Sequence, residues 1–239
     1  EFRSLGEIVH PNLIRFFRSY NEVGEWFYTM ELVDGVDFLS WVRPPPDPES
    51  FTGDIGTALG SCDLNRLREA LPQLMEGVRA LHREGKLHRD IKPPNILVRK
   101  DGSLVLLDFG LIKDVTSASG APPSDSSAAL SAPRQHLGQT VATMGGFCGS
   151  IGYMSPEQAR MSDLSEACDW YAVGVVLFEA LTGRRPFLGK GWNVLEKKQR
   201  FDAPSPAKFA RGLPDDLVDL CRALLDRDPE RRLEAARQY

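Results

Sequence analysis

The sequence predicts an α+β protein with a small strand-rich beginning and a mainly helical body. With 239 residues, 42% of them hydrophobic and 26% charged, the chain can bury one sizeable core or two small ones. Aromatic and β-branched residues from Leu13 to Leu32 surround a polar break at Asn21–Gly24, which is typical of a β-hairpin. From Leu64 onwards the apolar residues recur mostly at helical spacing, so most of the remaining chain is expected to be helical.

The first long helix is predicted between Leu64 and Leu81, with Asp63 as its N-cap. Residues 44–61 before it are rich in proline and glycine, and we expect a loop there. Pro72 falls inside the helix, where it removes a backbone donor and clashes with the preceding turn. We therefore expect a bend near Leu71.

Short strands and further helices follow. Strands are predicted at Ile96–Val98 and Leu104–Leu107, joined by a turn at Asp101-Gly102. Small and polar residues dominate from Val115 to Gly146, which predicts a flexible loop that cannot bury enough apolar surface to offset its ordering entropy. Helices are expected at Ala167–Leu181, which is almost wholly apolar, at Trp192–Arg200, at Pro214–Leu225 and after Pro229.

Charge and cysteine content exclude several classes of function. The formal net charge is −4 and the pI is about 5.7, which argues against nucleic acid as the main partner. The four cysteines form no C-x-x-C pair, which suits a reducing compartment better than a disulfide framework or a zinc site. The most apolar stretch, Tyr171–Leu181, is too short to cross a membrane. We expect a cytoplasmic location, with any membrane anchor outside this segment.

The most informative segment is His88–Asn95, which reads His-Arg-Asp-Ile-Lys-Pro-Pro-Asn and is followed, after twelve intervening residues, by Asp108-Phe109-Gly110. These motifs resemble those of the eukaryotic-type protein kinase family, and the resemblance implies a bilobal fold with a partial strand-rich N-lobe and a mainly helical C-lobe. Five further segments appear in kinase order: His10–Asn12, Met30–Gly35, Gly149–Glu157, Asp169–Gly174 and Asp228–Arg232. The bacterial serine/threonine kinases are most similar at His88–Leu97, Tyr153–Ala159 and Leu181–Phe187.

The resemblance assigns four residues to the chemistry. Phosphoryl transfer asks a protein mainly to position the reactants and to neutralise charge. Asp90 would orient the substrate hydroxyl, and Lys92 would place a cation against the γ-phosphate of ATP. Asn95 and Asp108 offer oxygen atoms that suit Mg²⁺.

The expected acceptors are serine and threonine hydroxyls of proteins. Kinases with a lysine two residues after the catalytic aspartate, as Lys92 follows Asp90, resemble the serine/threonine group. Ser150 matches the family position whose hydroxyl bonds that aspartate and lysine. The alternative interpretation of Ser150 is an ordinary loop serine.

By the same resemblance, the nucleotide would lie against the segment that links the first strands to the helical body. One residue would stand behind adenine, three would offer hinge backbone groups, one would bond the ribose and one would lie beneath the adenine ring. In that order these are Met30, then Glu31, Leu32 and Val33, then Asp37, then Leu97. Alternatively, Met30, Leu32 and Leu97 are simply core residues, which is compatible with lining a nucleotide pocket.

Three residues are assigned structural roles by the resemblance. Glu157 and Arg232 match a buried ion pair between the end of the activation segment and a late helix. Asp169 would accept hydrogen bonds from the backbone of the catalytic loop.

Regulation by phosphorylation is also expected. In kinases with an arginine before the catalytic aspartate, as Arg89 is here, that arginine meets a phosphate on the activation loop. The segment 108–157 is 50 residues long, and Thr140 and Thr143 are the candidate phosphorylation sites nearest its C-terminal end. The expected substrates then include the protein itself, by autophosphorylation. The alternative is that both are unmodified loop threonines.

Two parts of the kinase pattern are missing from these residues. No G-x-G-x-x-G motif occurs, and no strand lysine precedes the hinge. Glu1 stands nine residues before His10, at the family position of the glutamate that pairs with that lysine. We therefore expect an N-terminally truncated domain in which residues 1–33 are the remainder of the N-lobe. Residues 34–239 would form the C-lobe, with a loop insertion at 44–61 and a long activation segment at 108–157.

Two rival functions stay open. One is a truncated or pseudokinase-like module that binds ATP or a partner without turnover. The other is a small-molecule phosphotransferase, although such enzymes resemble this chain less at Ser155-Pro156-Glu157 and Asp228–Arg232. Intact Asp90, Lys92, Asn95 and Asp108 favour the protein kinase, because a binding module has no chemical need for all four.

Overall fold

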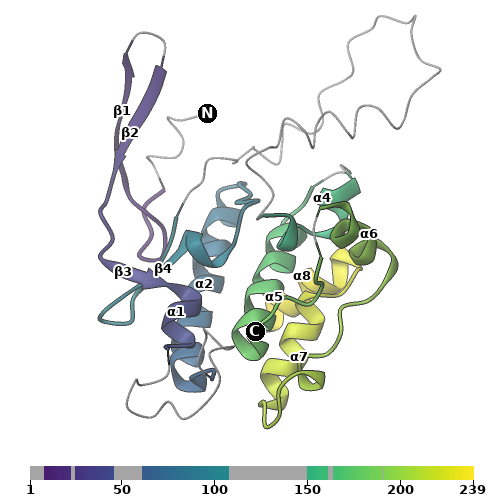
Figure 1. Ribbon diagram of the computed structural model, residues 1–239. Helices are drawn as coiled ribbons and strands as arrows, with labels where there is room; N and C mark the ends of the chain where they lie inside the picture. Colours follow the sequence, from purple (N-terminus) through teal and green to yellow (C-terminus); the bar gives the residue numbers. More distant parts are fainter. Residues whose placement is uncertain (1–7, 23–24, 46–60, 108–149, 161–163, 190) are drawn as a thin grey trace, which may run out of the picture.

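The computed structural model describes residues 8–22, 25–45, 61–107, 150–160, 164–189 and 191–239. It begins with an antiparallel hairpin of β1 (Phe16–Glu22) and β2 (Glu25–Met30), which projects from the rest of the protein (Figure 1). The rings of Tyr20 and Phe27 stack across this hairpin with centroids 5.6 Å apart. The hairpin predicted from the sequence is confirmed.

A second antiparallel sheet has the order β3-β4-β5, formed by Gly35–Asp37, Ile96–Arg99 and Leu104–Leu106. In the β3–β4 register Asp37 lies opposite Leu97. The turn between β4 and β5 uses Gly102, whose φ of 83° suits glycine. The predicted strands and their turn are confirmed.

Aspartate side chains cap the N-termini of two helices. Asp37 caps α1 (Phe38–Val42), and Asp63 caps α2 (Leu64–Arg83) by accepting hydrogen bonds from two backbone N–H groups. The predicted helix is therefore confirmed, and α2 is unbroken across Pro72, which lies on its exposed side. Its apolar face is fully buried, and this packing outweighs the lost backbone bond.

The remaining helices lie together next to α1 and α2 (Figure 1). The helix α5 (Ala167–Thr182) is buried on every side except at Glu179 and Thr182, as its apolar composition predicts, and it ends at Gly183 with φ of 72°. Within the described residues, the other helical elements are 3₁₀ turns η2 (Pro93–Asn95), η4 (Ser150–Gly152) and η5 (Pro206–Lys208), and helices α4 (Pro156–Arg160), α6 (Trp192–Arg200), α7 (Asp215–Leu224) and α8 (Pro229–Gln238). The helices α6, α7 and α8 confirm the three predicted after α5.

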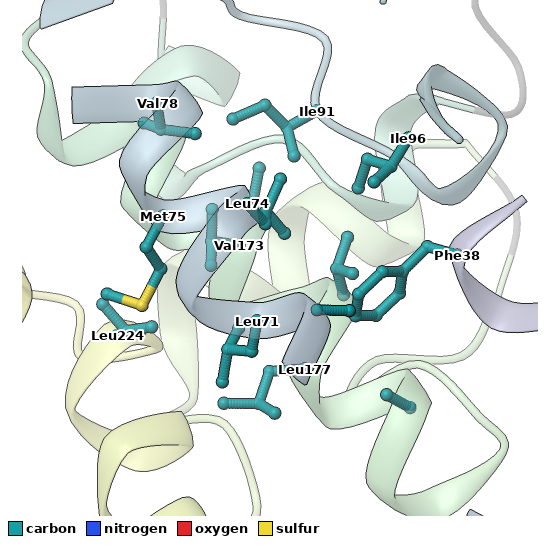
Figure 2. Close-up of a cluster of buried hydrophobic side chains, with 14 of the residues drawn as sticks. Phe38, Leu71, Leu74, Met75, Val78, Ile91, Ile96, Val173, Leu177 and Leu224 are labelled. Carbon is teal, nitrogen blue, oxygen red and sulfur yellow. The ribbon is translucent and has the colours of Figure 1, made fainter. Parts of the chain in front are cut away.

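One hydrophobic core joins α1, α2, α5 and α7 (Figure 2). Ile91, which stands between the predicted catalytic residues Asp90 and Lys92, and Ile96, which follows Asn95, also point into this core. The core therefore anchors this loop at two points. The side chains labelled in Figure 2 are Phe38, Leu71, Leu74, Met75, Val78, Ile91, Ile96, Val173, Leu177 and Leu224.

Most of the predicted loops at 44–61 and 108–157 fall outside the described residues. Within the part of the chain that the structure describes, no helix combines the length and apolar character needed to cross a bilayer. The cysteines Cys62, Cys168 and Cys221 are free thiols.

Candidate active site

The loop between α2 and β4 is held by a buried carboxylate. Asp169, at the start of α5, accepts hydrogen bonds from the backbone N–H of His88 at 2.8 Å and of Arg89 at 2.7 Å. Arg89 has φ of 67°, the one positive value at a non-glycine residue among the described parts of the chain, and such a conformation costs about 1–2 kcal/mol. The Asp169 bonds predicted from the resemblance are present, and they offset that cost.

The same carboxylate also contacts α2. Its Oδ2 lies 2.9 Å from His82 Nε2, so one buried group joins α2, α5 and the loop. Burial by itself would raise the pKa of Asp169. The hydrogen bonds from His82 and from the backbone outweigh burial, and the pKa lies below its usual value. The carboxylate is therefore ionised at neutral pH.

His88 is fully buried and bridges two segments of the site. Its Nε2 lies 2.8 Å from the carbonyl oxygen of Leu107, and its Nδ1 lies 3.3 Å from the backbone nitrogen of Asp90. A carbonyl can only accept, which assigns the proton to Nε2 and lets Nδ1 accept from Asp90. The sequence interpretation gave His88 no role, although a histidine within an otherwise assigned motif was the available signal.

Asp90, Lys92 and Asn95 converge on one another. Lys92 Nζ donates to Asp90 Oδ2 at 2.6 Å, and Asn95 Nδ2 donates to the same oxygen at 3.1 Å and to the Asp90 carbonyl at 2.8 Å. Side-chain exposure is 15% for Asp90 and 24% for Lys92, so a substrate can reach both. Because Asn95 uses its amide nitrogen on Asp90, its carbonyl Oδ1 is the atom available to a cation.

The chain that leaves β5 runs beside Asn95. The backbone N–H of Leu107 donates to the main-chain carbonyl oxygen of Asn95 at 2.8 Å. Asp108 follows Leu107 directly in the sequence but lies outside the described residues, as do Glu1, Thr140 and Thr143. The backbone of Ser150 forms the first residue of η4, and its side chain also lies outside the description.

The predicted nucleotide-binding residues are only partly brought together. Asp37 and Leu97 are cross-strand neighbours. However, Asp37 Oδ1 accepts from the backbone N–H of Leu39 at 3.0 Å and of Ser40 at 3.1 Å, so its carboxylate is also the cap of α1. The sequence pattern of an aspartate before a short apolar helix was a signal for this cap.

Two residues of the predicted hinge segment are too exposed to belong to the hydrophobic core. Met30 is 50% exposed and Leu32 is 94% exposed, whereas Val33 is partly buried. The alternative that Met30 and Leu32 are core residues is therefore wrong for this structure. The Glu31 carboxylate pairs with Arg99, and its backbone N–H donates to the Arg15 carbonyl at 2.9 Å.

The end of the predicted activation segment packs against the helical body. Glu157 of α4 forms the expected ion pair with the buried Arg232 of α8. Gln158 Nε2 donates to the Arg89 carbonyl at 3.3 Å, which links α4 to the loop between α2 and β4. Lys198 of α6 also reaches this region, although the sequence interpretation gave it no role. Its spacing from the buried Val194 and Leu195 was the signal, since both place it on the apolar face.

Comparison with known proteins agrees with this geometry. The protein kinase domain family matches residues 1–238. The chain is 27% identical over 237 residues, 99% of its length, to serine/threonine-protein kinase PrkC of Bacillus subtilis, and covers 31% of that protein. It is 27% identical over 235 residues, 97% of its length, to serine/threonine-protein kinase PknL of Mycobacterium tuberculosis, and covers 50% of it.

A plant relative matches more closely over a shorter region. The chain is 33% identical over 171 residues, 72% of its length, to serine/threonine-protein kinase AtPK2/AtPK19 of Arabidopsis thaliana, and covers 30% of that protein. The chain thus spans about a third to a half of the length of these curated relatives. With almost all its residues matched and the predicted bilobal kinase-like architecture in place, the chain belongs to the protein kinase domain family.

Proposed function

We propose that this protein transfers the γ-phosphate of ATP to serine or threonine hydroxyls of proteins. The observation that carries the proposal is the convergence of Lys92 and Asn95 on the carboxylate of Asp90. The loop that carries these residues is held by hydrogen bonds from its backbone to Asp169. The printed names of the relatives describe serine/threonine-protein kinases, which supports the same acceptor class.

The roles follow from the positions of the side chains. Asp90 accepts the hydrogen bond of the substrate hydroxyl and aligns its oxygen in line with the γ-phosphate. Lys92, beside Asp90, brings a compact cation to the charge that develops on the transferred group. In-line alignment and charge neutralisation are the two contributions this reaction needs most from a protein.

Asn95 and Asp108 would hold Mg²⁺. The fit rests on the donor set, because Asn95 Oδ1 is the atom that its bonds to Asp90 leave for a cation, and Asp108 adds a carboxylate close by in the sequence. When bound, Mg²⁺ neutralises phosphate charge and orients the phosphate oxygens. The nucleotide itself would lie near Met30, Glu31, Leu32, Val33, Asp37 and Leu97.

The two-lobe division is part of the proposal. Residues 1–33 would belong to the N-lobe and 34–239 to the C-lobe. In support, β1 and β2 pair only with each other among the described strands, whereas β3 pairs with β4, next to the catalytic loop.

A buried nitrogen of Arg89 supports regulation by a phosphate near this residue. Arg89 Nε is buried and has no hydrogen-bond partner among the described residues. A phosphate on Thr140 or Thr143 would supply an acceptor for the guanidinium and would order the segment. Phosphate mapping by mass spectrometry after incubation with Mg-ATP tests this, and phosphate found only outside 108–157 would contradict it.

The test of the function is transfer of labelled γ-phosphate to a generic basic protein by the full-length protein. Asp90→Asn should lower the transfer rate by about 10²–10⁴-fold, because the aligning base is lost while shape is kept. The matched control is Asp219→Asn, an exposed carboxylate on α7, which should leave the rate unchanged.

The other outcomes separate the rival functions. Transfer that survives Asp90→Asn within about twofold would contradict the proposed mechanism. Bound Mg-ATP with no transfer by the unmodified protein would favour a binding module without turnover.

A further inference from the structure

A lysine is buried beneath the segment that follows Ser150. Lys198, on α6, is 1% exposed, and its Nζ donates hydrogen bonds to three backbone carbonyls. The acceptors are those of Ile151 at 3.0 Å, Gly152 at 2.6 Å and Met154 at 2.7 Å. One side chain thus contacts almost every peptide unit of residues 151–154, hereafter the clamped segment.

The contacts match the donors of a lysine ammonium. A protonated lysine has three N–H donors and no acceptor, and three carbonyls meet them. The ring of Tyr171, 5.3 Å from Nζ, adds a cation–π contact. Burial lowers the pKa of Lys198 well below its usual value, and the nearby Arg185 lowers it further. Burying this cation is costly, and a hydrophobic side chain on the same helix face would avoid the cost.

Other contacts also hold this segment. The Tyr153 hydroxyl donates to Glu179 at 2.6 Å, and the guanidinium of Arg185 lies against Gly152 so closely that a Cβ there would overlap it. Ile151 packs with Phe187. The clamped segment therefore has one conformation, set by groups from α5, α6 and the turn between them, and Lys198 supplies the bonds to its backbone.

We infer that Lys198 is a positioning residue for the protein substrate. This inference rests on the proposed function. The clamped segment lies between Ser150, whose hydroxyl the family resemblance pairs with Asp90 and Lys92, and α4, which contacts the Arg89 carbonyl through Gln158. By setting the path of this backbone, Lys198 sets where the acceptor hydroxyl meets Asp90. ATP is expected to bind through other segments, so its binding should not depend on Lys198.

The test compares Lys198→Met with Lys197→Met. Methionine has a similar length without the donors, and Lys197 is the exposed neighbour on the same helix. We expect Lys198→Met to lower kcat/KM for a protein substrate by about 10- to 100-fold, because displacement of reacting groups by about 1 Å has effects of this size. Hydrolysis of ATP without a protein substrate should stay within about twofold, and Lys197→Met should change neither rate.

A second readout does not depend on activity. Amide hydrogen exchange of the clamped segment should become faster in Lys198→Met, while exchange in α2 and α5 stays the same. If the methionine variant does not fold, Lys198→Arg keeps the cation, and its larger head should displace the same carbonyls. That variant is then measured with the same two readouts.

Each outcome decides between the two claims. Equal losses of ATP hydrolysis and of protein phosphorylation, or unchanged exchange at residues 151–154, would overturn the role of Lys198. Absence of protein phosphorylation by the unmodified protein would instead refute the proposed function. The exchange data would still test whether Lys198 holds the clamped segment.

Discussion

The Glu157 carboxylate and the Arg232 guanidinium form a buried ion pair that joins α4 to α8. Arg232 is fully buried, and it also donates to the carbonyls of Ala167 at 2.9 Å and Asp226 at 2.7 Å. Burial lowers the pKa of Arg232, and the Glu157 charge opposes that shift. The guanidinium thus connects the end of the activation segment with the start of α5 and with the turn before α8.

Arg232→Ala should lower the free energy of unfolding by about 3–5 kcal/mol, because it leaves the charge of the Glu157 carboxylate buried without the Arg232 cation. Thermal unfolding measures the effect, at about 2–4 °C per kcal/mol for a protein of this size. The control is Arg231→Ala, an exposed neighbour whose side chain is 71% accessible. Equal melting temperatures for the unmodified protein and Arg232→Ala would show that the pair contributes nothing.

Asp169→Asn should destabilise the catalytic loop. The N–H of His88 meets Oδ2 and the N–H of Arg89 meets Oδ1, so in asparagine one of them would face an NH₂ group, which donates and cannot accept. The loss is about 1.5–3 kcal/mol for each hydrogen bond to a charged group, and phosphotransfer should fall with it. Urea unfolding and the activity assay test this, and unchanged activity would contradict the role assigned to Asp169.

The stability from Asp169 should depend on pH. Its pKa in the folded protein lies below the unfolded value of about 3.9, so the unfolded state binds more protons in this range. The contribution is therefore complete above about pH 4 and is lost as the pH falls through the folded pKa. The stability difference between the unmodified protein and Asp169→Asn should shrink from pH 6 to pH 3.5. A constant difference would be inconsistent with a depressed pKa.

Gly152→Ala should be destabilising in a way that a second substitution reverses. The new Cβ would overlap the Arg185 guanidinium and lie 3.0 Å from its Cδ. Overpacking of this kind costs about 1–3 kcal/mol, reduced if the arginine can move. In a double-mutant cycle measured by urea unfolding, Arg185→Ala should remove most of the cost. Additive effects would show that the two residues do not contact each other.

Gly174→Ala tests the close approach of α5 and α7. Alanine gains about 1 kcal/mol of helix propensity over glycine. However, its Cβ would lie 2.9 Å from Leu224 Cβ, an atom that side-chain rotation cannot move. Overpacking at about 1–3 kcal/mol should outweigh the propensity, so the melting temperature should fall. A rise would mean that the two helices separate without cost.

The sequence alone predicted the elements and the order of the motifs. Hydrophobic spacing and the cap at Asp63 placed α2, and the polar break at Asn21–Gly24 placed the first hairpin. These signals are local, because propensity, capping and periodicity act over a few neighbouring residues. Resemblance to kinases assigned the roles of Asp90 and Asn95 for the same reason, since each role follows from its position within a short motif.

Tertiary structure decided how individual polar side chains are used. It assigned the Asp37 carboxylate to a helix cap, left Leu32 exposed and buried Lys198 beneath backbone 44–47 residues earlier in the chain. It also placed His82 on Asp169, 87 residues away. Such pairings depend on which helices pack together, and no local pattern encodes them. The sequence thus determined which residues are available for the chemistry, and long-range packing decided what holds them in place.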